Sequence, residues 1–505
     1  MSRRRKRFTP APTPPQATAT VAPTRSDRWA DLFAIDARSL AAFRIGLGLW
    51  LLVDLVWRSF DLTAHYTDAG ILPRISRIGL YDLPGSDRKY WLSLFQITGD
   101  PWLVRGMFAA AAAAYLALAV GYRTRLAAVA SYVFVCSLQS RLTPVCDGGD
   151  GLIRVLLFWG LFLPLGGRFS WDVAVGGRPP APDRVCSFAT FALLFQVGSL
   201  YVFGAAAKSD PVWHTDHTAL YYALSVDAFA TPFGRWLAVQ HGLTRPLTFL
   251  VYWLEWLGPL VLLIPYRTAW LRLGVVAAFW GFHLGTAATF NLGLFPLAGC
   301  LAWVPFLPAR VWGRWRWAAA NPVGGAVRLG WVTTVVVAAV WAYVLVWNLR
   351  EANPWWLRVL PIEASVVGRL LRVDQDWAMF APKPLTEDGW YMMQGTLADG
   401  RVVNLWEPAA PLPFDKPADV ADTYVNTRWR KYLLNLNTRE YESHRVDFAS
   451  FLARRWADDH PGGPPVVRCE LVFMREPTPP PGEPVPAAER IVIFIGQDRK
   501  PDAAE

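Results

Sequence analysis

Long apolar runs alternate with short polar connections over residues 37–347 of this chain. A helix that crosses a bilayer needs about 20 largely apolar residues, because its backbone groups must bond to one another inside the hydrocarbon. The fourth and eighth runs are short, so these two helices could be tilted or re-entrant. The pattern predicts an all-α multi-pass membrane domain of about nine helices, at 37–57, 102–120, 126–142, 152–165, 188–207, 247–265, 271–295, 297–306 and 329–347.

The pattern changes after residue 348 to that of an α+β domain. Two apolar stretches flank Asp399-Gly400, which is a sequence typical of a β-hairpin turn. The predicted elements are hairpin strands at 390–397 and 401–406, helices at 422–436 and 444–459, and strands at 466–473 and 490–495.

Three parts follow along the chain. Residues 1–30 are basic and rich in Pro, Ala and Thr, which predicts a disordered cytoplasmic tail. Residues 31–348 form the membrane domain. Residues 349–505 form the α+β domain, which includes a Pro-rich loop and a C-terminal tail.

Composition supports a membrane class. The chain is 53% hydrophobic and 18% charged, whereas soluble domains carry about 25% charged residues. The net charge of +10 does not indicate nucleic-acid binding, because the cations gather in blocks at 3–7 and 310–328. Cytoplasmic loops are enriched in Lys and Arg. The basic connections at 122–125, 168–184 and 267–272 therefore place the N-terminus in the cytoplasm and the α+β domain outside it.

The charge of one loop does not fit this orientation. The first outward connection carries several cations, at Arg58, Arg74, Arg77, Arg88 and Lys89.

Two of the five cysteines, Cys146 and Cys469, lie on the outer side in this topology. An oxidising exterior permits a disulfide between them. The sequence leaves open whether they form a bridge or remain two free thiols.

Ionisable side chains within apolar runs are functional candidates, because an unpaired charge in a membrane is costly. Asp54, Arg154, Lys208 and Asn291 fall in the outer half of their helices, and Glu255 and His283 lie nearer the middle. We therefore expect a polar cavity that opens to the exterior beneath the α+β domain. Arg44 and Arg105 lie towards opposite faces of the membrane, and each is explained either as structural or as a cation that reaches up to the interface.

Lys208 has two interpretations. It could be a cation that reaches up to the interface, or it could be a lysine in a dry site that loses its proton near neutral pH and acts as a base. His283 is either a hydrogen-bonded packing residue or a catalyst. His214 and His217 have weak metal-ligand spacing, and we expect no metal site.

Several stretches resemble the HTTM family, the membrane domain shared with vitamin K-dependent gamma-glutamyl carboxylase. Their order and spacing, more than any one of them, carry the resemblance. They are Phe43-Arg44-Ile-Gly-Leu-Gly, the segment 65–74, Asp147-Gly-Gly-Asp150-Gly-Leu-Ile-Arg154, Phe203-Gly-Ala-Ala-Ala-Lys208-Ser-Asp210-Pro-Val-Trp213, the segment 282–296, and Gln375-Asp-Trp377-Ala-Met-Phe380-Ala-Pro382.

The resemblance implies a mechanism. In the carboxylase, a lysine deprotonates vitamin K hydroquinone, oxygen converts the quinol to a strong base, and this base removes a γ-proton from a glutamate that then adds carbon dioxide. The matching positions here are Lys208 and His283, which we take as the catalytic candidates. The candidates for binding substrate or cofactor are Asp54, Asp147, Asp150, Arg154, Trp213, Glu255 and Asn291.

One departure from the family keeps the function open. The carboxylase has an Asn-Asn-His stretch where this chain has Asp147-Gly-Gly-Asp150. One hypothesis is a carboxylase-like lyase that uses reduced vitamin K or another quinol, with membrane lipid and a polypeptide outside the membrane as partners. The other is a non-catalytic membrane protein that binds a lipid, quinone or protein through the same cavity. A transporter is less favoured, because we find no repeated halves.

Overall fold

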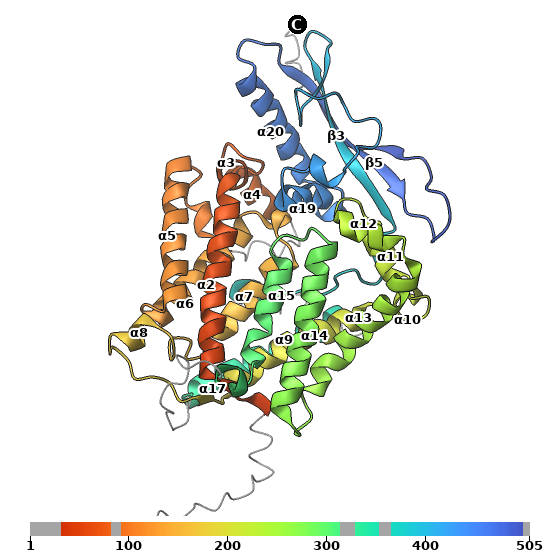
Figure 1. Cartoon of the computed structure of the whole chain (residues 1–505). Coiled ribbons are helices and arrows are strands. Elements are labelled where there is room, and N and C mark those ends of the chain that lie inside the picture. The colour runs from red at the N-terminus through yellow and green to blue at the C-terminus, as the bar shows by residue number, and fades with distance from the viewer. Residues whose placement is uncertain (1–31, 82–91, 314–328, 353–364, 498–505) are drawn as a thin grey trace, which may run out of the picture.

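The computed structural model describes residues 32–81, 92–313, 329–352 and 365–497. A bundle of helices forms the lower part of the molecule, and a sheet with two helices lies above it (Figure 1). We call the upper part, residues 387–497, the sheet domain.

Each of the nine apolar runs contains a helix among the described residues. Five of these helices are long and apolar enough to cross a membrane, namely α2, α5, α9, α14 and α17. The chain is therefore a helical membrane protein. Five of the predicted helices are candidate spans, and the full number of nine spans is not established. The bundle helices are α2 (Ala37–Phe60), α5 (Pro101–Val120), α6 (Thr124–Arg141), α7 (Gly148–Gly160), α9 (Phe188–Ala207), α13 (His241–Val261), α14 (Thr268–Thr289), α15 (Phe295–Ala302) and α17 (Trp331–Ala352).

Local signals fix the ends of these helices. Asp100 precedes α5, and its side chain accepts hydrogen bonds from the backbone N–H groups of the first turn. Gly121 ends α5 in a left-handed conformation with φ of 79°, which costs a glycine little. Ser187 and Thr190 form a reciprocal capping box at the start of α9.

The sheet domain is an antiparallel four-stranded sheet in the order β4-β3-β5-β6. The predicted hairpin is confirmed, and Gly400 adopts a φ of 86° in its turn. The side chain of Asn426 caps the first helix of this domain, so that helix begins later than residue 422. The elements are β3 (Glu387–Leu397), β4 (Val402–Asn404), β5 (Val466–Pro477), β6 (Glu489–Gln497), α19 (Thr427–Leu436) and α20 (His444–Asp459).

The sheet domain is seated on the bundle through α19 (Figure 1). Asn435 Nδ2 donates to the carbonyl of Pro144 at 2.8 Å, and Arg428 Nη1 donates to the carbonyl of Val145 at 3.1 Å. Both carbonyls belong to the connection between α6 and α7. Cys146 and Cys469 are free thiols, so the disulfide alternative is wrong.

Residues 373–382 connect the two parts and pack among the bundle helices. The side-chain oxygen of Gln375 accepts hydrogen bonds from Gln196 of α9 at 2.6 Å and from the indole of Trp377 at 2.7 Å. Sequence composition assigned this segment to the upper domain, but its buried polar contacts belong to the bundle.

Candidate functional site

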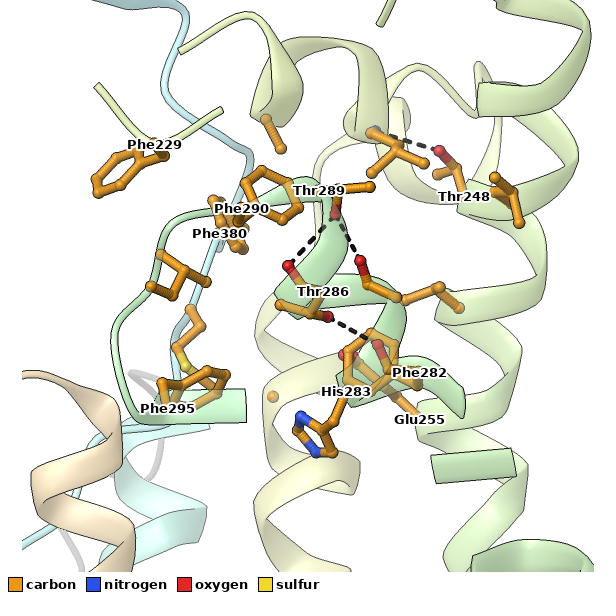
Figure 2. Close-up of a pocket in the computed structure, with 18 of the residues that line it drawn as sticks. Phe229, Thr248, Glu255, Phe282, His283, Thr286, Thr289, Phe290, Phe295 and Phe380 are labelled. Atoms are coloured by element: carbon orange, nitrogen blue, oxygen red, sulfur yellow. Dashed lines mark hydrogen bonds between the residues drawn. The ribbon is translucent and has the colours of Figure 1, made fainter. Parts of the chain in front are cut away.

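A cavity of about 1000 Å³ lies between α9, α13 and α14, beneath the sheet domain. Aromatic side chains make much of its wall, including those of Phe282, Phe290 and Phe295 (Figure 2). Short helix α12 (Pro232–Ala238) contributes Phe233 and Trp236, which are 50% and 52% exposed. The cavity is therefore apolar and borders the outer surface of the bundle at α12.

Lys208 and Glu255 form a buried ion pair in this wall. Lys208 Nζ lies 2.6 Å from Glu255 Oε2 of α13, and the two side chains are 5% and 10% exposed. Nζ also lies 3.4 Å from the carbonyl of Gly204 and 5.1 Å from the ring centre of Trp213. Glu255 Oε1 makes no hydrogen bond with any described residue and is not sealed from the cavity.

The ion pair fits neither interpretation of Lys208 as stated, because a lysine base should also lack a close carboxylate partner. A lysine that reaches up to the interface keeps its ammonium in water, whereas this ammonium is buried against a carboxylate. Asp210 is not the partner, because its side chain caps the short helix α10 (Pro211–His214) by accepting from Val212 N at 3.1 Å. Pairing offsets much of the cost of burying either charge.

His283 lines the cavity, as predicted, and its ring is held in place by its neighbours. Its ring is 1% exposed, and Nε2 lies 2.7 Å from the hydroxyl of Tyr201. Trp303 Nε1 donates to the same hydroxyl at 3.0 Å. An indole can only donate, so the Tyr201 hydrogen is free to bond with His283 Nε2. A Cβ at Gly299 would lie 2.1 Å from His283 Cε1, so the ring rests on a glycine.

Asp54 and Asp150 do not line the cavity, and the expectation that Asp54 does is wrong. Arg58 Nε lies 2.7 Å from Asp54 Oδ2, one turn along α2, and Arg58 also pairs with Asp150. Arg428 of α19 completes the cluster by pairing with both carboxylates, at 3.0 Å from Asp150 Oδ2. These four charges join the sheet domain to the bundle.

Arg154 and Asn291 also lie outside the cavity wall. Arg154 Nη1 donates to Gln139 Oε1 at 2.8 Å, and Nη2 lies 3.5 Å from Asp374 Oδ2. Asn291 lines a smaller polar cleft next to the cavity. Depth along the chain did not predict the direction in which these residues point.

Arg44 has a structural role. Its guanidinium donates to backbone carbonyls, including those of Leu165 at 3.1 Å and Phe169 at 2.6 Å. Arg105 lies over the ring of Trp102 at 4.7 Å.

Asp147 lies in the cavity wall at the start of α7. Its Oδ1 accepts from Gly149 N at 2.8 Å and from Asp150 N at 3.1 Å, while Asp150 Oδ2 accepts from Asp147 N at 2.9 Å. Burial, with a contribution from the nearby Asp150 carboxylate, raises the pKa of Asp147 to about 6.

Sequence reasoning missed the residues that the sheet domain contributes to this cavity, which are Thr427, Arg430 and Lys431 of α19. Their spacing on one helix face carries no signal that distinguishes them from surface residues. Among the described residues, no group of three or more His, Cys, Asp or Glu side chains could hold a metal. The rings of His214 and His217 bond to backbone carbonyls, at 3.1 Å in each case.

No protein-family model matches this chain, and neither a curated protein nor a solved structure matches it. What the site can do therefore follows from its geometry and chemistry.

Proposed function

We propose that this membrane protein binds a quinol, or a similar amphiphile with an acidic hydroxyl, in the cavity, and that the Lys208–Glu255 pair removes the hydroxyl proton. The observation that carries this proposal is the buried ion pair in the wall of an apolar cavity of about 1000 Å³. A large apolar pocket with a few convergent polar groups is the default binding site of a protein.

Most of the hydroxyl groups in the wall have no donor to offer a ligand. Thr286 Oγ1 donates to the carbonyl of Phe282 and Thr289 Oγ1 to that of Gly285, each at 2.9 Å (Figure 2). Thr248 Oγ1 donates to the carbonyl of Thr244, also at 2.9 Å. The unused hydrogen-bonding capacity on this side of the cavity is therefore concentrated at Glu255 Oε1. A ligand with an apolar ring and one hydroxyl matches this distribution.

The proton balance assigns a role to each member of the pair. The hydroxyl proton passes to Glu255 Oε1, which becomes a neutral acid, and the ligand becomes an oxyanion beside the Lys208 ammonium. One negative charge moves from the carboxylate to the ligand, and the positive charge stays on Lys208. The resemblance gives the role of base to Lys208, whereas the 2.6 Å contact favours Glu255 as base and Lys208 as the group that stabilises the oxyanion.

The later steps come from the resemblance alone. They are oxidation of the quinolate by dioxygen and carboxylation of a polypeptide glutamate. We propose that the sheet domain is extracytoplasmic and the N-terminus cytoplasmic, which would bring such a polypeptide to the same side as the cavity. The basic connections 122–125 and 168–184 support this orientation.

The test measures binding and epoxidation of vitamin K hydroquinone by the purified full chain. Glu255→Gln should lower turnover by at least about 100-fold, the usual contribution of a general base, with a hydroquinone Kd within about tenfold of wild type. Glu255→Gln leaves the Lys208 ammonium unpaired. The double variant Lys208→Met/Glu255→Gln contains neither charge, so it serves as the comparison that should remain folded. Glu442→Gln, at a side chain that is 66% exposed, is the matched control.

Lys208→Arg separates the two base assignments. Arginine keeps the charge but does not lose its proton. Retained turnover in this variant fits Glu255 as base, and complete loss with intact folding returns the role to Lys208. If wild type binds hydroquinone but neither it nor any variant turns it over, the non-catalytic binding hypothesis replaces the enzymatic one.

A further inference from the structure

The end of the cavity next to the sheet domain carries a second set of polar groups. Asp147 of the bundle and Thr427 and Lys431 of α19 line it, and we call these three residues the roof. None of them contacts the Lys208–Glu255 pair. The proposed proton transfer leaves them without a role.

Each roof residue has unused hydrogen-bonding capacity. Asp147 Oδ1 accepts two backbone hydrogen bonds, whereas its Oδ2 accepts none from a described residue. The hydroxyl of Thr427 and the ammonium of Lys431 make no hydrogen bond or ion pair within the described ranges, and Lys431 is half-buried. Arg430 differs from them, because its guanidinium donates to the carbonyls of Ala228 and Asn291.

The roof is held in place from both domains. Thr427 and Lys431 are one turn apart on α19, so their side chains share a face of that helix. Arg428 and Asn435 fix the same helix to the connection that precedes Asp147. A Cβ at Gly293 would lie 3.1 Å from Thr427 Oγ1, which shows how closely the chain before α15 approaches.

Asp147 supplies a carboxylate acceptor, and Lys431 and Thr427 supply donors, with no ion pair between the two charges. Such a set complements a group that carries both signs, while the neighbouring Arg430 already donates to two backbone carbonyls. We propose that the roof binds the headgroup of a zwitterionic phospholipid with a primary ammonium, of the phosphatidylethanolamine type.

In this arrangement the ligand ammonium donates to Asp147 Oδ2, and the phosphate accepts from Lys431 and Thr427. The acyl chains lie along the aromatic wall and leave past Phe233 and Trp236 of α12. The inference rests on the proposed use of the cavity for membrane amphiphiles, but it does not depend on the proton transfer at Glu255.

The experiment measures lipid binding to the purified full chain in detergent by native mass spectrometry. Phosphatidylethanolamine should bind at least about tenfold more tightly than phosphatidylcholine, whose quaternary ammonium has no N–H to donate, and than the anionic phosphatidylglycerol. Free phosphoethanolamine should bind at least about 100-fold more weakly, because it lacks the chains. Equal affinity for the three lipids, or tight binding of free phosphoethanolamine, would overturn the assignment.

Three variants tie the preference to the roof. Asp147→Asn keeps an N-cap acceptor for α7, so it should fold and reduce the preference for phosphatidylethanolamine by about fivefold or more. Lys431→Gln and Thr427→Val should weaken binding of the same lipid. Glu442→Gln should leave it unchanged, and thermal unfolding identifies any variant that has lost its fold.

The outcomes separate this inference from the proposed function. If lipid preference survives all three roof variants while turnover still requires Glu255, the roof assignment is wrong and the proposed function stands. If turnover is absent in wild type while the roof variants abolish the lipid preference, the reverse holds.

Discussion

Lys208 Nζ and Glu255 Oε2 lie 2.6 Å apart, although their residues are 47 positions apart in the chain. Lys208 ends α9 at its C-cap, and Glu255 lies within α13. The contact therefore joins two helices of the bundle at the wall of the cavity. Neither charge is paired within its own helix, so each depends on the other helix for its partner.

This dependence predicts strong coupling between the two side chains. Lys208→Met and Glu255→Gln should each destabilise the protein by about 3–5 kcal/mol, because each leaves one buried charge uncompensated. The double variant should recover most of that loss, because no charge remains. Thermal unfolding of the purified protein, arranged as a double-mutant cycle, measures the coupling. Additive losses in the double variant would show that the pair does not form.

Sequence reasoning identified both members of this pair, because an ionisable residue within an apolar run is conspicuous. It also found Asp147, Trp213 and His283, which line the same cavity. It did not pair Lys208 with Glu255. Depth along a helix follows from counting residues, whereas the partner depends on how each helix is rotated about its axis.

Asp54 and Arg154 are two further residues whose partners could not be predicted from the sequence. Arg58 lies one turn from Asp54 and pairs with it, and Arg428 pairs with Asp54 although the two residues are 374 positions apart in the chain. Gln139 and Asp374 hold Arg154 in a similar way. Long-range partners of this kind leave no local signal in a sequence.

The cations in the loop that does not fit the predicted orientation have a structural explanation. Arg58 belongs to the buried charge cluster, Arg74 pairs with Asp68 at 2.8 Å, and Arg77 Nη2 donates to the carbonyl of Ser140 at 2.8 Å. These cations take part in packing and pairing. Arg88 and Lys89 lie outside the described residues.

The contact between His283 and Gly299 leads to a second prediction. Gly299→Ala should destabilise the protein by about 1–3 kcal/mol, because the added Cβ would meet a ring that its hydrogen bond to Tyr201 holds in place. Gly274→Ala is the matched control, since a Cβ at that helical position meets no atom within 4 Å. Thermal unfolding compares the two. Equal midpoints in both variants would show that the ring is free to move.

A third prediction concerns pH and the sheet domain. Burial, with a contribution from Asp227, raises the pKa of Asp388 to about 7, well above the ordinary value for an aspartate. Lys416 does not neutralise it directly, because the ammonium pairs with Asp227 and Glu476. The folded protein therefore keeps a proton on Asp388 that the unfolded chain has already lost between about pH 4 and pH 7.

The sign follows from this difference in bound protons. The stability that Asp388 contributes is fully present below about pH 4 and is lost as the pH rises to about 7, by up to about 1.4 kcal/mol per pH unit. Asp388→Asn should match wild type below about pH 4 and become more stable than wild type as the pH rises to about 7. Thermal unfolding from about pH 4 to about pH 8 measures this growing difference, with the exposed Asp458→Asn as control. A constant difference between Asp388→Asn and wild type at all pH values would contradict the raised pKa.

The orientation in the membrane leads to the last prediction, and the chain carries its own reporter. Cys186 is exposed and lies just after the basic connection 168–184, on the side that the charge pattern places in the cytoplasm. A membrane-impermeant maleimide should therefore fail to label Cys186 in intact cells and should label it after permeabilisation. In a Cys186→Ser background, Asp399→Cys in the exposed hairpin turn should be labelled in intact cells, whereas Val175→Cys, at a side chain that is 59% exposed, should not. The reverse pattern would place the sheet domain in the cytoplasm. A polypeptide partner outside the cell would then be out of reach of the cavity, whatever chemistry Glu255 performs.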